Sequence, residues 1–154
     1  MNDPLRIPVI NISPLLLAGT GGPSAEVIEQ VRAATQKVGF MYITGHGVPA
    51  DLIGRMKDIS RRFFQLPLAE KQRISMQEGG KAWRGFFKVG DELTSGVADQ
   101  KEGIYFGSEM PADHPLPLHG PNLWPSGELG REMKEIVLDY IARMQQLGTI
   151  CIDL

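Results

Sequence analysis

The feature that most constrains the fold is a short strand that runs into a glycine-rich turn and then into a helix. Residues 40–44 are apolar, aromatic or β-branched, which predicts a buried strand. Gly45, His46 and Gly47 follow as a tight turn, and Pro49 suits the first turn of a helix. The chain therefore needs both extended and helical elements in one fold.

Helical periodicity appears in four stretches, one of which is the helix that opens at Pro49. The first helix is predicted to begin after an N-cap at Ser24 and to end at Gly39, a residue suited to a left-handed C-terminal position. Residues 49–66 form the second helix, whose apolar stripe consists of Leu52, Met56, Ile59 and Phe63. A short helix is predicted over 68–74, with Glu70, Lys71 and Arg73 in solvent.

The last helix is predicted from about residue 129 to residue 154. Its wide apolar face consists of Met133, Ile136, Val137, Tyr140, Ile141, Met144 and Leu147. It runs to the final residue without a stop signal, which indicates a truncated domain. In the chain alone, this apolar face is expected to be exposed and to favour self-association.

Strand patterns account for the remaining segments. A strand is predicted over residues 7–12, and two more over 83–87 and 101–107. Between 75 and 126 no helical periodicity is visible, and 110–125 is a proline-rich loop. The order of elements predicts an α+β fold, and residues 1–154 contain no linker that would divide them into two domains.

Composition excludes several classes of protein. The 154 residues carry a net charge of −2, without the basic surface of a nucleic-acid binder. The longest apolar run near the start, 15–18, is too short for a membrane helix, so no membrane association is expected. Cys151 is the single cysteine, so no disulfide can form within the chain, which favours a reducing, cytoplasmic location. Its side chain is predicted to be packed.

Four segments, in order, resemble one enzyme family. They are IPVINISPL at 7–15, GFMYITGHGVP at 39–49, FFQLPLAEK at 63–71, and a last segment with RGF at 84–86, KEGIYFG at 101–107 and GPNLWP at 120–125. Together they resemble the N-terminal region of the iron(II)- and 2-oxoglutarate-dependent oxygenases of the isopenicillin N synthase type. Asn11, Gly45 and the pair Ile104 and Tyr105 depart from the usual pattern.

The resemblance implies a region that flanks a double-stranded β-helix (jelly-roll) barrel. In the family, a His-x-Asp pair and a distant histidine hold iron, an Arg-x-Ser holds 2-oxoglutarate, and a small molecule is oxidised. Here His46, His114 and His119 are not followed two residues later by Asp or Glu, and Arg73 to Ser75 lies too early. The chain is therefore expected to stop before the barrel, to bind neither iron nor 2-oxoglutarate alone, and to be inactive.

Three residues are candidates for substrate binding. The resemblance places 83–87 beside the mouth of the active site, where Arg84 would hold a substrate carboxylate. Phe86 and Phe87 would then line an apolar pocket. The alternatives are an Arg84 ion pair with Asp91, Glu92 or Glu102, and core packing of both phenylalanines.

Two other interpretations remain open. The last helix would let an inactive product serve as an interaction module through its apolar face. A loop carrying Glu109, Asp113, His114 and His119 has donor atoms for zinc, although its prolines favour a solvated loop. His46 is expected to be structural and to stabilise its turn through a hydrogen bond.

Overall fold

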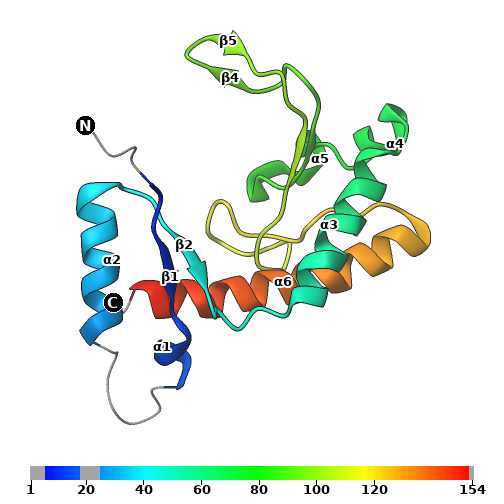
Figure 1. The fold of residues 1–154 in the computed structure, drawn as a ribbon. Coiled ribbons are helices and arrows are strands. Elements are labelled where there is room, and N and C mark those ends of the chain that lie inside the picture. The colour runs from blue at the N-terminus through cyan, green and yellow to red at the C-terminus, as the bar shows by residue number, and fades with distance from the viewer. Residues whose placement is uncertain (1–5, 18–24, 153–154) are drawn as a thin grey trace. The chain divides into compact units, whose positions relative to one another are not determined.

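The computed structural model describes residues 6–17 and 25–152, which mix helices and strands as the α+β prediction requires. They fall into two compact units (Figure 1). Unit 1 contains the chain up to Pro49 and from Arg143 onward, and unit 2 contains Ala50–Ala142. The predicted N-cap Ser24 and the last two residues lie outside the described part.

Unit 1 is built on a parallel pair of short strands. Strand β1 (Val9–Asn11) pairs with β2 (Tyr42–Thr44), with Ile10 opposite Ile43. Helix α1 (Ser13–Leu17) follows β1, and α2 (Ala25–Lys37) lies beside the strands (Figure 1). The core of this unit consists of Ile10, Ile12, Val27, Ala34 and Leu147.

The strand after α2 is exposed rather than buried, contrary to the prediction. Phe40 is 71% exposed and Tyr42 63%, while Met41 and Ile43 pack against the core. The alternation follows from strand geometry, because successive side chains point to opposite faces and only one face meets α2. The run of apolar residues resembled a strand covered on both faces, but only one face is covered within unit 1.

The turn between β2 and the next helix depends on a glycine. Gly45 has a φ of 65°, and a Cβ atom there would lie 2.3 Å from Asn11 Oδ1. That oxygen accepts a hydrogen bond of 3.0 Å from the Ser13 amide. His46 Nδ1 accepts one of 3.1 Å from the Val48 amide, which confirms the structural role predicted for this histidine.

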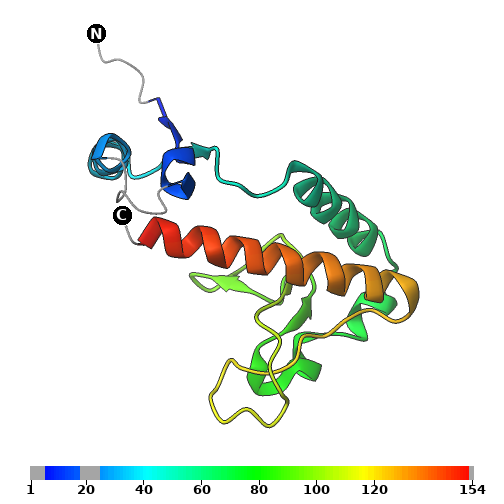
Figure 2. The same cartoon turned by 90° about the horizontal axis from the view of Figure 1, so that it is seen from below.

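Unit 2 is organised around two helices. Helix α3 (Ala50–Phe64) packs against the first half of α6 (Gly127–Ile152) and crosses it at an angle (Figure 1 and Figure 2). The predicted stripe of α3 is confirmed, since Leu52, Ile59 and Phe63 are buried. Salt bridges join Arg62 to Glu132 and Arg55 to Glu135 at the solvent edge of this pair.

The predicted exposure of the α6 apolar face is wrong for most of the face, although Met144 is 40% exposed. Met133, Ile136 and Val137 are 1–2% exposed, and Tyr140 and Ile141 pack against the same core. Residues of α3 and of the following loops cover this part of the face, and self-association or partner binding through the helix stays a prediction. Cys151, predicted to be packed, is exposed, one residue before the end of α6.

The rest of unit 2 is made of short elements. Helix α4 (Leu68–Gln72) is followed by α5 (Met76–Gly79) and a 3₁₀ turn, η1 (Gly80–Ala82), which the sequence did not predict. Both predicted strands form, as an antiparallel pair of β3 (Gly85–Phe87) and β6 (Gly103–Tyr105). Between them lies a small hairpin of β4 (Leu93–Thr94) and β5 (Val97–Ala98).

No helix in the described part of the chain is both long and apolar enough to cross a lipid bilayer.

Candidate functional site

Unit 2 contains an open groove of about 640 Å³. Two of the three candidate residues, Phe86 and Phe87, line it, together with Trp83 and residues of α5. On its other side lie Lys88, Asp91 and Glu92, at the base of the β4–β5 hairpin. The groove therefore combines an aromatic wall with charged side chains.

Strand β3 is held in place by a close approach to the backbone before α5. The Phe86 amide donates to the Ile74 carbonyl at 2.7 Å, and a Cβ at Gly85 would lie 2.6 Å from that oxygen. Phe86 is 2% exposed and packs edge-on against Phe63 in the unit 2 core. Phe87 is 6% exposed, and its ring centroid lies 5.1 Å from that of Tyr105. Core packing thus accounts for both rings, and each also reaches the groove.

Arg84 does not form any of the ion pairs considered for it. Its guanidinium donates to the Ala82 carbonyl at 2.9 Å and to the Leu118 carbonyl at 3.1 Å. It lies flat against Gly107, where a Cβ would be 2.1 Å from Arg84 Nη2. The side chain thus ties η1 to the 110–120 loop and does not line the groove. Substrate binding by Arg84 stays a prediction.

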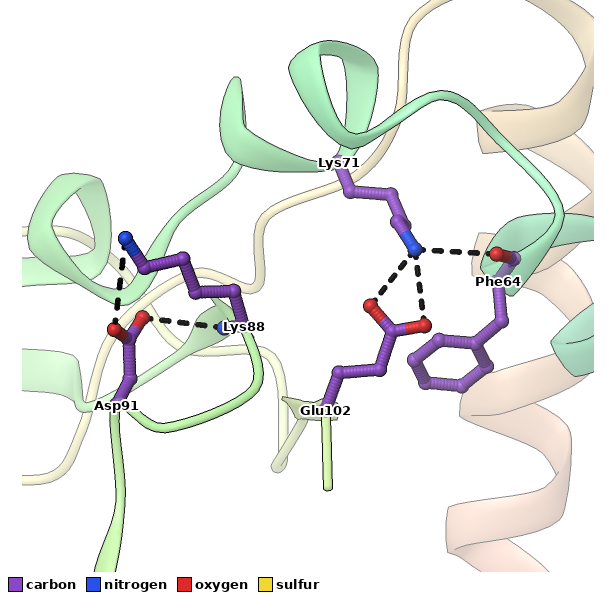
Figure 3. Close-up of polar contacts among 5 residues, drawn as sticks. All are labelled: Phe64, Lys71, Lys88, Asp91 and Glu102. Atoms are coloured by element: carbon purple, nitrogen blue, oxygen red, sulfur yellow. Dashed lines mark hydrogen bonds and ion pairs between the residues drawn. The ribbon is translucent and has the colours of Figure 1, made fainter. Parts of the chain in front are cut away.

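Lys71 and Glu102 form the most buried ion pair of unit 2. Lys71 Nζ lies 3.0 and 2.8 Å from the two Glu102 carboxylate oxygens and donates to the Phe64 carbonyl at 3.1 Å (Figure 3). The ammonium also lies 5.3 Å from the ring centroid of Phe86, a cation–π distance. Lys71 was predicted to be in solvent, but its side chain is 7% exposed, because α4 turns this residue toward β6.

Two acidic residues of the groove are engaged at the hairpin base. Asp91 lies 3.9 Å from Lys88 Nζ and accepts a hydrogen bond of 3.1 Å from the Lys88 amide (Figure 3). Glu92 accepts a short hydrogen bond from the Tyr105 hydroxyl and pairs with Lys101 at 2.9 Å. These contacts, that from Tyr105 first, lower the pKa of Glu92 below its ordinary 4.5, and Glu92 in turn raises the pKa of Tyr105 above 10.0.

We expect the hairpin base to lose stability in acid. The pKa of Glu92 is depressed in the folded state, so its contribution is present above pH 4.5 and is lost as pH falls through the lower folded value. Carboxyl-carbon NMR titration should report a Glu92 pKa below 4.5 that moves back toward it in Tyr105→Phe. Tyr140→Phe, which is remote from this carboxylate, is the matched control. An unchanged Glu92 pKa in Tyr105→Phe would contradict the assignment.

The histidine-bearing loop does not gather a metal site. His114 and His119 stack with ring centroids 4.6 Å apart. His114 Nδ1 accepts from the Leu116 amide at 3.3 Å, which places the ring proton on Nε2, the nitrogen a metal would need. Throughout 6–17 and 25–152, no three His, Cys, Asp or Glu side chains lie close enough together to hold a metal ion, which contradicts the zinc interpretation.

The segments that carried the family resemblance contact one another through Asn122. This buried side chain accepts from the Gly107 amide and donates to the Gly107 carbonyl, both at 2.8 Å. It also donates to Glu109 at 2.6 Å, and next to it Trp124 stacks on Phe106 at 4.8 Å. The string GPNLWP therefore fixes the end of KEGIYFG by hydrogen bonds and stacking.

Comparison with known proteins identifies the family. Residues 7–127 match the sequence profile described as "non-haem dioxygenase in morphine synthesis N-terminal". The chain is 41% identical over 138 residues to a probable iron/ascorbate oxidoreductase of Dictyostelium discoideum, covering 83% of this chain and 38% of the relative. It is 38% identical over 149 residues to a 2-oxoglutarate-dependent dioxygenase of Talaromyces stipitatus, covering 92% and 46%.

A third relative is a homoarginine-6-hydroxylase of Arabidopsis thaliana, 36% identical over 145 residues, covering 88% of this chain and 43% of the relative. The chain thus spans less than half the length of these relatives.

Solved structures show the same fold. The chain superposes on a full-length Neurospora crassa protein in complex with alpha-KG with a TM-score of 0.74 at 24% identity, covering 97% of this chain and 46% of that one. A rice dioxygenase for auxin oxidation gives a TM-score of 0.56 at 24% identity, covering 96% and 43%. The profile match and the relatives establish that the chain belongs to the N-terminal domain family of the non-haem, iron- and 2-oxoglutarate-dependent dioxygenases.

Proposed function

We propose that this chain is the N-terminal part of an iron(II)- and 2-oxoglutarate-dependent dioxygenase that oxidises a small molecule. One observation carries the proposal: the family profile covers residues 7–127, while the chain spans only 38–46% of the relatives' length. A cytoplasmic location is part of the proposal and rests on the single cysteine.

The iron ligands are proposed to lie outside the 154 residues. Iron in this family is held by two histidines and a carboxylate. The described residues do not fit that set, since His46 and His114 each accept a backbone hydrogen bond on Nδ1 and no three donor residues gather. We infer that the barrel supplies the iron site and that this portion is inactive alone.

Unit 1 supports the proposal through its exposed strand face. Val9 is 64% exposed, Phe40 71% and Tyr42 63%. These side chains lie on or next to a sheet of only two parallel strands. Parallel strands are normally covered on both faces, and large exposed apolar patches mark interfaces. We infer that the missing barrel covers this face.

The groove in unit 2 supplies the proposed substrate wall. Phe86 and Phe87 line it, as the substrate-binding prediction requires. Arg84 lies behind this wall, so its part in substrate binding would be to hold η1 and the 110–120 loop in place. The barrel would close the groove from its open side.

We expect the 154-residue chain to bind well under one iron per chain after anaerobic dialysis against Fe(II). It should form no succinate from 2-oxoglutarate. A longer reading frame that continues past Leu154 through a His-x-Asp and a later histidine should gain both properties. Stoichiometric iron binding together with succinate formation by the 154-residue chain would overturn the proposal.

A further inference from the structure

An exposed tryptophan in a strained backbone conformation lines the groove. Trp83 is 58% exposed, although the next residues of β3 are buried. Its φ of 55° lies in the left-handed region, which is unfavourable for a bulky side chain, and its amide donates to the Gly80 carbonyl at 3.2 Å. Strain of this kind concentrates at ligand sites, because the surrounding structure must maintain it. Trp83 ends η1 in this conformation and holds a largely exposed indole at the groove wall.

The groove also offers a free carboxylate. Its acidic side chains are Glu78, Asp91 and Glu92, against the single ammonium of Lys88. Asp91 pairs with Lys88, and Glu92 contacts Tyr105 and Lys101. Within the described residues, the Glu78 side chain forms neither an ion pair nor a hydrogen bond. An unpaired carboxylate beside an exposed indole favours a positively charged ligand.

We propose that the groove binds a planar organic cation of the guanidinium type, stacked on Trp83 and paired with Glu78. A guanidinium stacks on aromatic faces and matches a carboxylate with two parallel hydrogen bonds, whereas an ammonium does neither as well. Phe86 and Phe87 would contact the aliphatic part of the ligand. Binding of the cation in the groove does not depend on the proposed function. Only the identification of this cation as the substrate of the dioxygenase rests on it.

The test is an NMR titration of the isotope-labelled 154-residue chain with L-arginine and with its neutral isostere L-citrulline. Arginine should shift the amides of residues 72–78 and 83–92 saturably, with a Kd on the order of millimolar for so few contacts. Citrulline should bind at least about tenfold more weakly, since it lacks the charge. Equal binding of the two, or arginine shifts outside the groove, would overturn the inference.

Variants separate the two contacts. Glu78→Gln should weaken arginine binding about fivefold or more, while Glu128→Gln, an exposed carboxylate outside the groove, should leave it unchanged. Trp83→Leu should weaken binding about threefold to fivefold, whereas Trp83→Phe keeps an aromatic face and should retain most of it. If Trp83→Leu loses the dispersed NMR spectrum of a folded chain, the test rests on arginine binding by Glu78→Gln and Trp83→Phe. Unchanged arginine binding in Glu78→Gln would refute the site. The titration involves neither iron nor turnover, so an absence of arginine binding would leave the dioxygenase proposal standing. Failure of the iron and succinate experiment would likewise leave the arginine site standing.

Discussion

Replacing Glu102 by leucine is expected to lower the free energy of unfolding by about 3 kcal/mol, because it leaves the Lys71 ammonium buried without a counter-charge. The Lys71 side chain is 7% exposed, and Glu102 supplies both oxygens that neutralise it. The remaining contacts of Lys71, with the Phe64 carbonyl and the Phe86 ring, compensate only part of that charge. Urea denaturation of the parent and variant chains measures the difference.

Two controls test the buried ion pair itself. The double variant Lys71→Met with Glu102→Leu removes both charges and should recover most of the loss, since apolar replacements of a buried pair are often neutral. Glu132→Leu breaks a pair of similar length, 2.8 Å to Arg62, whose side chains are 42% and 40% exposed. Its loss of stability should be much smaller than that of Glu102→Leu, because solvent screens an exposed pair. A Glu102→Leu loss as small as that of Glu132→Leu would show that Lys71 reaches water.

The long helices could be predicted because their stripes repeat over several turns. Leu52, Ile59 and Phe63 on α3 and Met133 and Val137 on α6 are buried at the positions that helical spacing indicated. Periodicity does not say what covers a stripe, however. The α6 face is therefore expected from the sequence to be exposed, whereas residues distant in sequence cover most of it. Lys71 was misassigned for a related reason: α4 has only 5 residues, too few to define a buried side.

The candidate site could be predicted only in part. Phe86 and Phe87 stood out as an aromatic pair in an extended segment, and both line the groove. Trp83 could not be predicted as a groove residue, because no sequence pattern marks a non-glycine residue with a positive φ. The partners of Arg84 could not be foreseen either, since both are backbone carbonyls and one belongs to Leu118, 34 residues away. Sequence patterns report charges more readily than backbone acceptors.

Two glycines of α6 should respond in opposite ways to alanine. At Gly130, near the start of the helix, a Cβ would lie 1.7 Å from the Pro125 carbonyl oxygen, which is rigid backbone. Gly130→Ala must therefore displace the turn that leads into α6, and we expect it to lower the free energy of unfolding by about 3 kcal/mol. The same turn carries the stacked Trp124, so its near-ultraviolet circular dichroism should change as well.

Gly148 is the matched control on the same helix. A Cβ there meets nothing within 4 Å, and its φ is not in the left-handed region. Gly148→Ala should raise the free energy of unfolding by about 0.5–1 kcal/mol, because alanine restricts the unfolded chain and favours helix. Urea denaturation of both variants makes the comparison. Stabilisation by Gly130→Ala would show that the Pro125 carbonyl does not lie against the helix, and that the segment carrying Asn122 and Trp124 enters α6 by another path.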